Sequence, residues 1–519
     1  MFDTSSPVEV SRPLPSAARD QNVLTAAKGG GITFAGKLFT SGSRFIMAIL
    51  LTRLLGAEQY GLFNLALTAI AVMGGLSMLG LDSALVRYVA LMVSQRDESG
   101  LRGALQFCLG TIAVLSVLLA AGLYALADPI AIQIFHEPQL APLLRLASLI
   151  VPILAMSDAL VNATQGFKKM HYATISQDVV RPLLRLILIG VLIVIGLTAE
   201  GAVAIFGVAV AITTVMLVYY LHKEFPLRGL FQPARYDIKE LLNFSMPVYL
   251  SGLLGTFRGN FQTMLLGSLN NVTSVGIFVV AGQLGFIGGL FQGAVTTAAK
   301  PILAELYDRK EREQMGRLYQ AVTKWMFTLN FPIFLAMVLF PIPLMSIFGK
   351  SFVGGATALA ILAWAKLIDM GTGMCGAVLD MSGYTKLKLV NTIVQLVLSL
   401  TLNFLLIPKW GIIGAATAAL VNISVINLLR LVEVYIVLRL LPYNLSFLKP
   451  IAAGLVALAL ILTIGWWFPA GANLIYVAIH IAILFAVYAG LVLLLGLSAE
   501  DRLILARLRR RTSAKWSKS

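Results

Sequence analysis

Residues 28–61, KGGGITFAGKLFTSGSRFIMAILLTRLLGAEQYG, decide the fold of this chain. From about residue 30 to residue 54 the stretch is apolar, and as a helix rising about 1.5 Å per residue it can cross a hydrocarbon core of roughly 30 Å. Lys37 and Arg44 lie inside it, at a spacing that places them on one helical face. An arginine near the bilayer centre costs about 2.5–3.5 kcal/mol, so it normally faces a bundle interior or a wet cavity. We therefore expect a polar cavity that binds an anion.

The composition is that of a polytopic membrane protein. The chain has 519 residues, of which 58% are hydrophobic, and its mean hydropathy is +0.87. Only 12% of the residues are charged, and they fall between apolar runs that are mostly about 18–25 residues long, the length of spanning helices. The sequence thus predicts an all-α membrane protein with about 14 transmembrane helices around a central cavity.

Charge, cysteine and histidine usage exclude several other classes. The net charge of +16 resides in short loops rather than on a basic soluble face, so we expect no nucleic-acid partner. Cys108 and Cys375 fall in separate predicted spans, and the four histidines are scattered, so we expect neither a disulfide nor a metal site. The Gly-Lys-Ser sequence at 349–351 lacks the earlier glycine of a P-loop, so no ATP-driven pump is predicted.

The apolar runs form two groups of six, with two further runs after them. We predict a cytosolic N-terminal tail (1–28), an N-lobe (29–221), a cytosolic linker (222–240), a C-lobe (241–440), two additional helices (441–497) and a basic cytosolic tail (498–519). Most of the 40 lysines and arginines lie in short connections on one side, so the positive-inside rule places both termini in the cytosol. The basic tail is either a solvated stop-transfer signal or an amphipathic segment on anionic lipid.

The two groups of six resemble each other. YGLF at 60–63 is echoed by VGIF at 275–278, QGFKK at 165–169 by SGYTK at 382–386, and GAVA at 201–204 by GIIG at 411–414. The echoes come about 210–217 positions later, which indicates parallel repeats related by an axis along the membrane normal. Arg44 precedes Gly61 by nearly the same number of residues as Arg258 precedes Gly276. We therefore predict that the two arginines face each other across this axis.

These motifs carry a family resemblance. With RLLGAEQYGLFNLA at 53–66, GIFVVAG at 276–282, the QGFKK and SGYTK turns and GIIGAA at 411–416, residues 28–497 resemble the polysaccharide-transporter branch of the multidrug/oligosaccharidyl-lipid/polysaccharide (MOP) flippase superfamily. The resemblance implies two six-helix lobes in a V shape. It also implies translocation of undecaprenyl-diphosphate-linked saccharide from the cytosolic to the outer leaflet. The last two helices occur in some members, including lipid II flippases, so they do not settle the substrate.

The intramembrane cations are the candidate diphosphate site. A lipid diphosphate needs charge neutralisation inside a low-dielectric interior, and arginine offers paired donors matched to phosphate oxygens. This favours Arg44 and Arg258, whose own helices carry no central acid, and more weakly Lys37. The alternative for each is pairing with an acid from another helix or snorkelling to an interface.

Intramembrane acids are the candidate coupling groups. Lys366 and Asp369 stand at a spacing that lets them pair on one helix. They are either a structural salt bridge or a switch in which Asp369 takes a proton or sodium ion and releases Lys366 to the substrate. Asp158 is a second candidate, and its alternative is a capping or pairing role. We expect no cofactor apart from such a coupling ion.

Further polar residues could contact the substrate. Arg181 and Arg185 are predicted at the cytosolic mouth, where they either collect anionic head groups or simply anchor the loop by the positive-inside rule. Amides in the spans suit sugar hydroxyls but equally suit interhelical hydrogen bonds; these are Asn260, Gln262, Gln283 and Gln292.

The sequence therefore predicts a transporter, not an enzyme. We expect a monomeric flippase of the bacterial inner membrane, moving a lipid-linked anionic oligosaccharide by alternating access, in contact with membrane lipids and with polysaccharide polymerase and export proteins. The alternatives are a lipid II flippase, a drug or cation antiporter of the same superfamily, and a membrane glycosyltransferase or polymerase. A cation antiporter requires acids at the cavity centre. A glycosyltransferase requires an outer catalytic domain, and the longest predicted outer connection has only about 15 residues.

Overall fold

The computed structural model describes residues 16–196, 198–226, 232–467 and 473–495. Within these ranges, side chains are described from residue 39 onward, apart from those at 195, 251, 254, 257–259, 286 and 290. Across this described part every regular element is helical, and ten helical stretches are long and apolar enough to cross a membrane. This confirms the all-α polytopic class.

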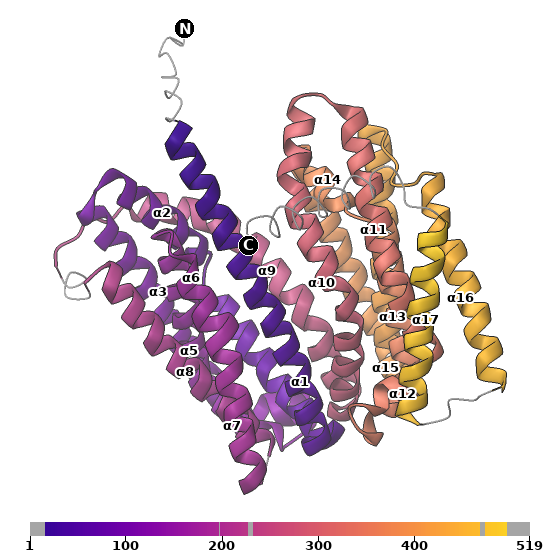
Figure 1. Cartoon of the computed structure of the whole chain (residues 1–519). Coiled ribbons are helices and arrows are strands. Elements are labelled where there is room, and N and C mark those ends of the chain that lie inside the picture. Colours follow the sequence, from indigo (N-terminus) through magenta and orange to yellow (C-terminus); the bar gives the residue numbers. More distant parts are fainter. Residues whose placement is uncertain (1–15, 197, 227–231, 468–472, 496–519) are drawn as a thin grey trace, which may run out of the picture.

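The first half of the chain forms the indigo-to-magenta bundle of Figure 1. Its elements include two short π-helical segments, η1 and η2. The elements are α1 (Ser16–Ser77), α2 (Leu81–Gln95), α3 (Glu98–Ala125), α4 (Ala127–Pro129), η1 (Ile130–Ile134), α5 (Leu140–Gly166), α6 (Met170–Ala173), η2 (Thr174–Val180), α7 (Arg181–Ile195) and α8 (Ala199–Glu224).

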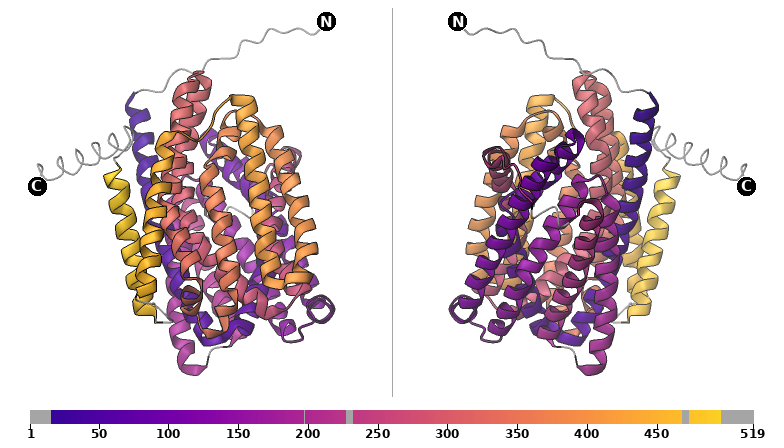
Figure 2. Two further views of the ribbon diagram at one scale, coloured as in Figure 1. Left: turned by 90° about the vertical axis from the view of Figure 1, so that its right-hand side faces the viewer. Right: turned by 90° about the vertical axis from the view of Figure 1, so that its left-hand side faces the viewer.

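The second half forms the bundle beside it, and its last two helices lie at one edge of the molecule (Figure 2). The elements are α9 (Ile238–Leu269), α10 (Val272–Asp308), α11 (Arg312–Leu339), α12 (Pro341–Ser346), η4 (Lys350–Gly355), α13 (Ala356–Thr372), α14 (Cys375–Met381), α15 (Thr385–Leu438), η5 (Leu445–Phe447), α16 (Leu448–Trp467) and α17 (Leu474–Leu494). The edge pair packs on α11, where the Tyr488 hydroxyl donates to the Thr328 carbonyl over 3.0 Å.

Glycines divide the two longest helices. Gly56 adopts a φ of 74° inside α1 and Gly411 a φ of 51° inside α15, a region that glycine enters without strain. The break at Gly56 divides α1 into two arms that form a hairpin, and the first arm contains the apolar span predicted from about residue 30 to residue 54. Residues 16–28, which we predicted as a flexible tail, are helical. They contain neither proline nor glycine, so the spanning helix propagates through them.

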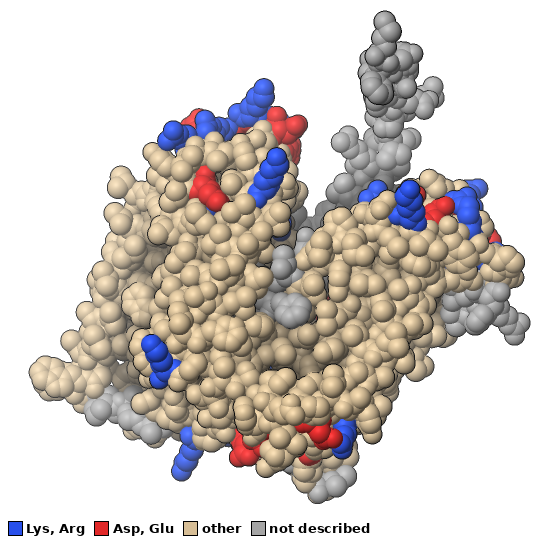
Figure 3. Space-filling model, turned by 180° about the vertical axis from the view of Figure 1, so that it is seen from behind, with Lys and Arg blue, Asp and Glu red and all other residues tan. Residues whose placement is uncertain are grey.

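A cleft separates the two halves at one end. Figure 3 shows charged side chains gathered at two opposite ends, with a largely uncharged band between them. The halves diverge at the end where α1 begins, which we call the open end (Figures 1 and 3). They meet where Ala57 and Gly61 of α1 contact α10, which we call the closed end. The uncharged band is the part of the surface that suits hydrocarbon.

Two repeat glycines meet at the closed end. A β-carbon on Gly61 would lie 2.0 Å from the Val272 carbonyl oxygen, and one on Gly276 would lie 2.2 Å from the Ala57 carbonyl oxygen. The backbones of α1 and α10 are therefore in direct contact, which only glycine allows. Nearby, Arg53 Nε donates to the Ile347 carbonyl over 2.8 Å. The landmark glycines of the repeat thus join the halves.

This contact predicts that Gly61→Ala and Gly276→Ala destabilise the closed end. Either methyl group would force the backbones apart, and overpacking of this kind costs about 1–3 kcal/mol. We expect both variants to lower the apparent melting temperature in detergent by several degrees. Gly110→Ala is the control, because a β-carbon there meets nothing within 4 Å. Equal melting temperatures for all three variants would contradict the contact.

Candidate functional site

A cavity of about 230 Å³ lies where α10 meets the helices of the first half. Two arginines, Arg44 from the first arm of α1 and Arg185 from α7, line it together with polar groups from the second arm of α1 and from α10. None of the described residues that line this cavity is acidic. Its lining comprises Arg44, Met47, Ala48, Leu51, Tyr60, Phe63, Asn64, Leu67, Arg185, Ile189, Ala202, Ile205, Phe206 and Gln283.

Arg185 is held in place by an aromatic ring rather than by an acid. Its guanidinium carbon lies 4.1 Å from the centre of the Phe206 ring, a cation–π geometry that orients the planar group. Its Nε atom is buried and has no hydrogen-bond partner. With Arg44 in the same cavity, two positive charges share a site that offers them no carboxylate. Such a site favours an anion.

The structure separates Arg185 from Arg181. We predicted both at the mouth, but Arg185 lines the cavity with Arg44. The signal was present in the sequence, where the apolar run around Arg185 extends from about residue 175 to residue 197. A residue about ten positions into a helix of this length lies about 15 Å deep, halfway across a core of about 30 Å. Arg181 lies one turn earlier and donates to Ser157 Oγ (2.6 Å) and Thr213 Oγ1 (3.2 Å).

A hydrogen bond links the cavity to the second half of the chain. Gln283 Nε2 on α10 donates to the Tyr60 hydroxyl over 3.0 Å, and Tyr60 is only 2% exposed. Asn64, one turn further along α1, donates to the Tyr60 carbonyl over 2.7 Å. Gln283 Oε1 is buried without a hydrogen-bond partner. Two side chains that line the cavity thus carry an unpaired donor, Arg185 Nε, and an unpaired acceptor, Gln283 Oε1, among the described residues.

Asp158 belongs to a separate cluster around the π-helical segment η2. Gln177 Nε2 donates to Asp158 Oδ1 over 2.9 Å, and Arg181 interacts electrostatically with the same carboxylate. Thr40 on α1 donates to the Asp178 carbonyl over 2.8 Å. A π-helical turn displaces backbone carbonyls from their regular partners and often marks functional sites. Here it connects α1, which carries Arg44, to the Asp158 cluster.

Lys366 and Asp369 form the core of a polar cluster in the second half. Lys366 Nζ lies 2.9 Å from Asp369 Oδ2 and donates to Gln292 Oε1 over 2.8 Å. Gln292 Nε2 donates back to Asp369 Oδ2 over 3.1 Å, and Asn427 Nδ2 donates to Asp369 Oδ1 over 3.1 Å. Both carboxylate oxygens of Asp369 are thus occupied by side chains from three helices, α10, α13 and α15.

Two predicted residues lie beyond the described side chains. The backbone of Lys37 belongs to α1 and that of Arg258 to α9, but their side chains are outside the part that the structure describes. The pairing of Arg44 with Arg258 across the axis therefore stays a prediction. Of the other two amides, Gln262 donates to the Ala415 carbonyl of α15 over 2.6 Å, whereas Asn260 donates to the Thr256 carbonyl of its own helix over 3.0 Å.

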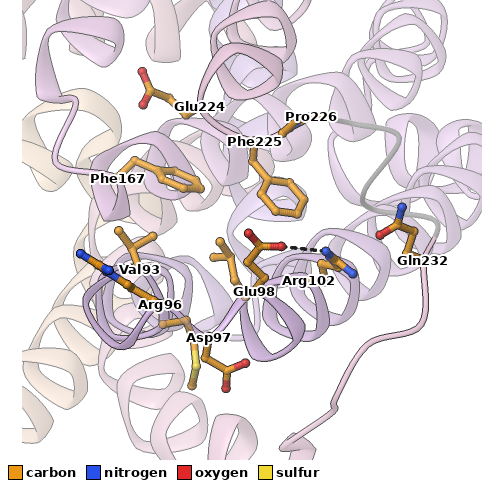
Figure 4. Close-up of a pocket in the computed structure, with 12 residues that line it drawn as sticks. Val93, Arg96, Asp97, Glu98, Arg102, Phe167, Glu224, Phe225, Pro226 and Gln232 are labelled. Atoms are coloured by element: carbon orange, nitrogen blue, oxygen red, sulfur yellow. Dashed lines mark hydrogen bonds and ion pairs between the residues drawn. The ribbon is translucent and has the colours of Figure 1, made fainter.

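A larger cavity, of about 760 Å³, lies at the open end of the first half (Figure 4). Its charges are compensated by neighbours: Glu98 pairs with Arg102 over 2.9 Å, and Asp97 pairs with Arg235 over 2.9 Å. The Gly100 N–H, bonded to Asp97 at the start of α3, lowers the pKa of that carboxyl. Because these cations are paired with carboxylates, the cavity is a poor site for an anion. Arg44 does not line it.

Phe206, Gln177 and Asn427 are site residues that the sequence reasoning missed. Asn427 and Gln177 are polar residues in apolar spans, and such residues usually turn toward other helices. That signal marks them as interior but does not say which carboxylate each contacts. The contact between Phe206 and Arg185 depends on how α7 packs against α8. The sequence of either helix does not determine that packing by itself.

Comparison with known proteins now assigns the family. The model of the polysaccharide biosynthesis protein family matches residues 26–307. The chain belongs to the polysaccharide biosynthesis protein family. A second model, MatE, matches residues 247–405. Together they place this polysaccharide biosynthesis protein among the membrane transporters of the MOP flippase superfamily, as the sequence motifs indicated.

Individual relatives agree with this assignment. Stage V sporulation protein B of Bacillus subtilis is 24% identical over 92% of this chain and 97% of its own length. Succinoglycan biosynthesis transport protein ExoT of Rhizobium meliloti is 24% identical over 58% of each chain. Among solved structures, the lipid II flippase MurJ in an inward closed conformation superposes with a TM-score of 0.69 at 13% identity, covering 90% of this chain and 98% of that one. This last likeness shows a shared fold.

The Lys366–Asp369 pair is expected to contribute to the stability of the folded protein. Breaking a fully buried pair costs about 3–5 kcal/mol, and because these side chains remain 23% and 26% exposed, we expect about 1–3 kcal/mol for Asp369→Asn. Apparent melting temperatures in detergent measure the loss. The double variant Lys366→Met/Asp369→Leu should recover most of it, since no charge is left unpaired. A double variant less stable than the single one would contradict this account of the pair.

Proposed function

We propose that this protein is a flippase that carries an oligosaccharide linked to undecaprenyl diphosphate across the bacterial inner membrane. The observation that carries the proposal is the placing of Arg44 and Arg185 in one cavity without an acidic residue. The substrate head group is a diphosphate, and arginine binds phosphate oxygens through paired, charge-assisted donors. The family assignment and the relative named as a succinoglycan transport protein support an oligosaccharide as the cargo.

The proposed mechanism is alternating access. The cleft is open at one end (Figure 3), and α1 and α10 touch at the other through Gly61 and Gly276. We place the open end in the cytosol because most of the 40 lysines and arginines fall in the connections assigned to that side. The lipid-linked saccharide enters from there with its diphosphate on the arginines. Separation of the glycine contact then releases it toward the outer leaflet.

Ion coupling is proposed at Lys366 and Asp369. Protonation of Asp369, or binding of a sodium ion to it, would weaken its attraction to Lys366 and change the contacts among α10, α13 and α15. Asp158 is the second coupling candidate, because its contacts reach η2 and thereby α1. A proton or sodium gradient would in this way bias the two states of the cleft.

The runner-up function is a lipid II flippase. Its substrate also carries a lipid diphosphate, and the fold is shared with a solved lipid II flippase, so the arginine cavity serves both. A drug or cation antiporter is disfavoured by two cations in a cavity without an acidic lining residue. A glycosyltransferase or polymerase is disfavoured by the transporter family assignment.

The proposal predicts that arginine substitutions stop transport. Loss of one charge-assisted contact costs about 1.5–3 kcal/mol, equivalent to about a 10–100-fold effect. Arg44→Ala and Arg185→Ala should each reduce by at least about tenfold the appearance of lipid-linked glycan in the outer leaflet of proteoliposomes. Arg258→Ala belongs in the series because the repeat predicts its equivalence to Arg44.

Arg145→Ala is the matched control, since this arginine pairs with Asp128 on an exposed surface. It should leave the transport rate unchanged. Wild-type rates for the Arg44 and Arg185 variants, in protein inserted normally, would refute the anion site.

Coupling predicts a separate behaviour for the double variant Lys366→Met/Asp369→Leu. If Asp369 exchanges the ion, this variant should be stable but its transport should no longer respond to an imposed pH or sodium gradient. Initial rates with and without each gradient give the answer. A gradient response equal to that of the wild type would reduce the pair to a structural salt bridge.

A further inference from the structure

Two residues that line the arginine cavity, one from each half of the chain, carry polar atoms without partners among the described residues. Arg185 Nε and Gln283 Oε1 are both buried without hydrogen-bond partners, and both residues line the same cavity. The first is a donor and the second an acceptor. Since buried polar atoms are almost always paired, this combination fits a ligand that brings an acceptor and a donor side by side.

A phosphate alone does not satisfy both atoms. An ionised phosphate oxygen accepts from Arg185 and Arg44, but it has no proton to donate to Gln283 Oε1. A prenyl chain offers neither kind of group. A sugar joined to the phosphate supplies hydroxyl donors next to the phosphate acceptors. The junction between phosphate and sugar is therefore the part of the proposed substrate that matches the cavity.

The position of Gln283 is fixed by its neighbour. Its Nε2 donates to the Tyr60 hydroxyl over 3.0 Å, and Oε1 is the amide atom left without a partner among the described residues. Tyr60 itself is held by packing, with its ring centre 6.1 Å from that of Phe352 and 2% of its surface exposed. An acceptor on a rigid support discriminates better than one on a flexible side chain.

The size of the cavity limits how much of the substrate it takes. Pockets that enclose drug-sized ligands measure roughly 300–1,000 Å³, and this one measures about 230 Å³. It is too small for a whole glycan, so a lipid-linked glycan can place in it only the part next to its phosphates.

We infer that Gln283 is a specificity-determining residue that binds a hydroxyl of the first, phosphate-linked sugar while Arg44 and Arg185 bind the phosphates. The inference rests on the proposed function and deepens it. It accounts for how one transporter accepts a long glycan through a small site. It also places the sugar contact on α10, the helix that touches α1 at the closed end.

The test measures affinity for two probes in the full-length protein in lipid nanodiscs. The probes are farnesyl diphosphate and the same molecule carrying one N-acetylglucosamine on the terminal phosphate. The wild-type protein should bind the sugar-bearing probe about three- to tenfold more tightly, the value of one hydrogen bond. Gln283→Leu should abolish this difference while keeping the affinity for farnesyl diphosphate, which also shows that the variant is folded. Gln59→Leu is the control, a nearby glutamine of α1 that bonds Gln139 outside the cavity.

The outcomes separate the subsite from the proposed function. A sugar preference that survives in Gln283→Leu, or is absent from the wild type, overturns the subsite while binding of farnesyl diphosphate upholds the anion site. Failure of the wild type to bind farnesyl diphosphate, or equal binding by Arg44→Ala and Arg185→Ala, overturns the proposed function and the subsite with it.

Discussion

The cost of holding a cation among membrane-spanning helices governs this structure. Four such residues meet this cost in three ways. Lys366 is neutralised by Asp369 and also donates to Gln292. Arg181 is solvated by hydroxyl groups and lies near Asp158. Arg44 and Arg185 share a cavity whose lining contains no acid. The first two arrangements are internally compensated, and only the third leaves positive charge for an external ligand.

The helix α1 connects this charge to the rest of the molecule. Its first arm carries Thr40, which bonds the η2 backbone, and Arg44. Its second arm begins with Tyr60, which bonds Gln283 on α10, and Gly61, which touches α10 directly. A ligand bound to Arg44 therefore contacts the same helix, α1, whose second arm makes the contact with α10 that closes the cleft. Because the two backbones touch, small displacements there cannot be absorbed by side-chain rotation alone.

The membrane-spanning helices and part of the candidate site could be predicted from the sequence. Periodicity and length predicted the spans, and the repeated YGLF and VGIF motifs predicted matching landmarks, although not that Gly61 and Gly276 touch each other. Arg44 was identifiable because the apolar span around it, from about residue 30 to residue 54, holds no acid. Arg185 was identifiable only from its depth along the helix. Its grouping with the other basic residues near the loop led us to place it at the cytosolic mouth instead. The partners of Asp369 could not be predicted, because Gln292 and Asn427 reach it from helices whose relative rotation is set by packing.

A structure of the protein with a bound prenyl diphosphate tests the central claim most directly. The account predicts that, in nanodiscs with farnesyl diphosphate, cryo-electron microscopy will show the phosphates within hydrogen-bond distance of the Arg44 and Arg185 guanidinium groups. The prenyl chain should lead away from Gln283. A lipid diphosphate bound elsewhere, with both arginines out of contact, would contradict the account.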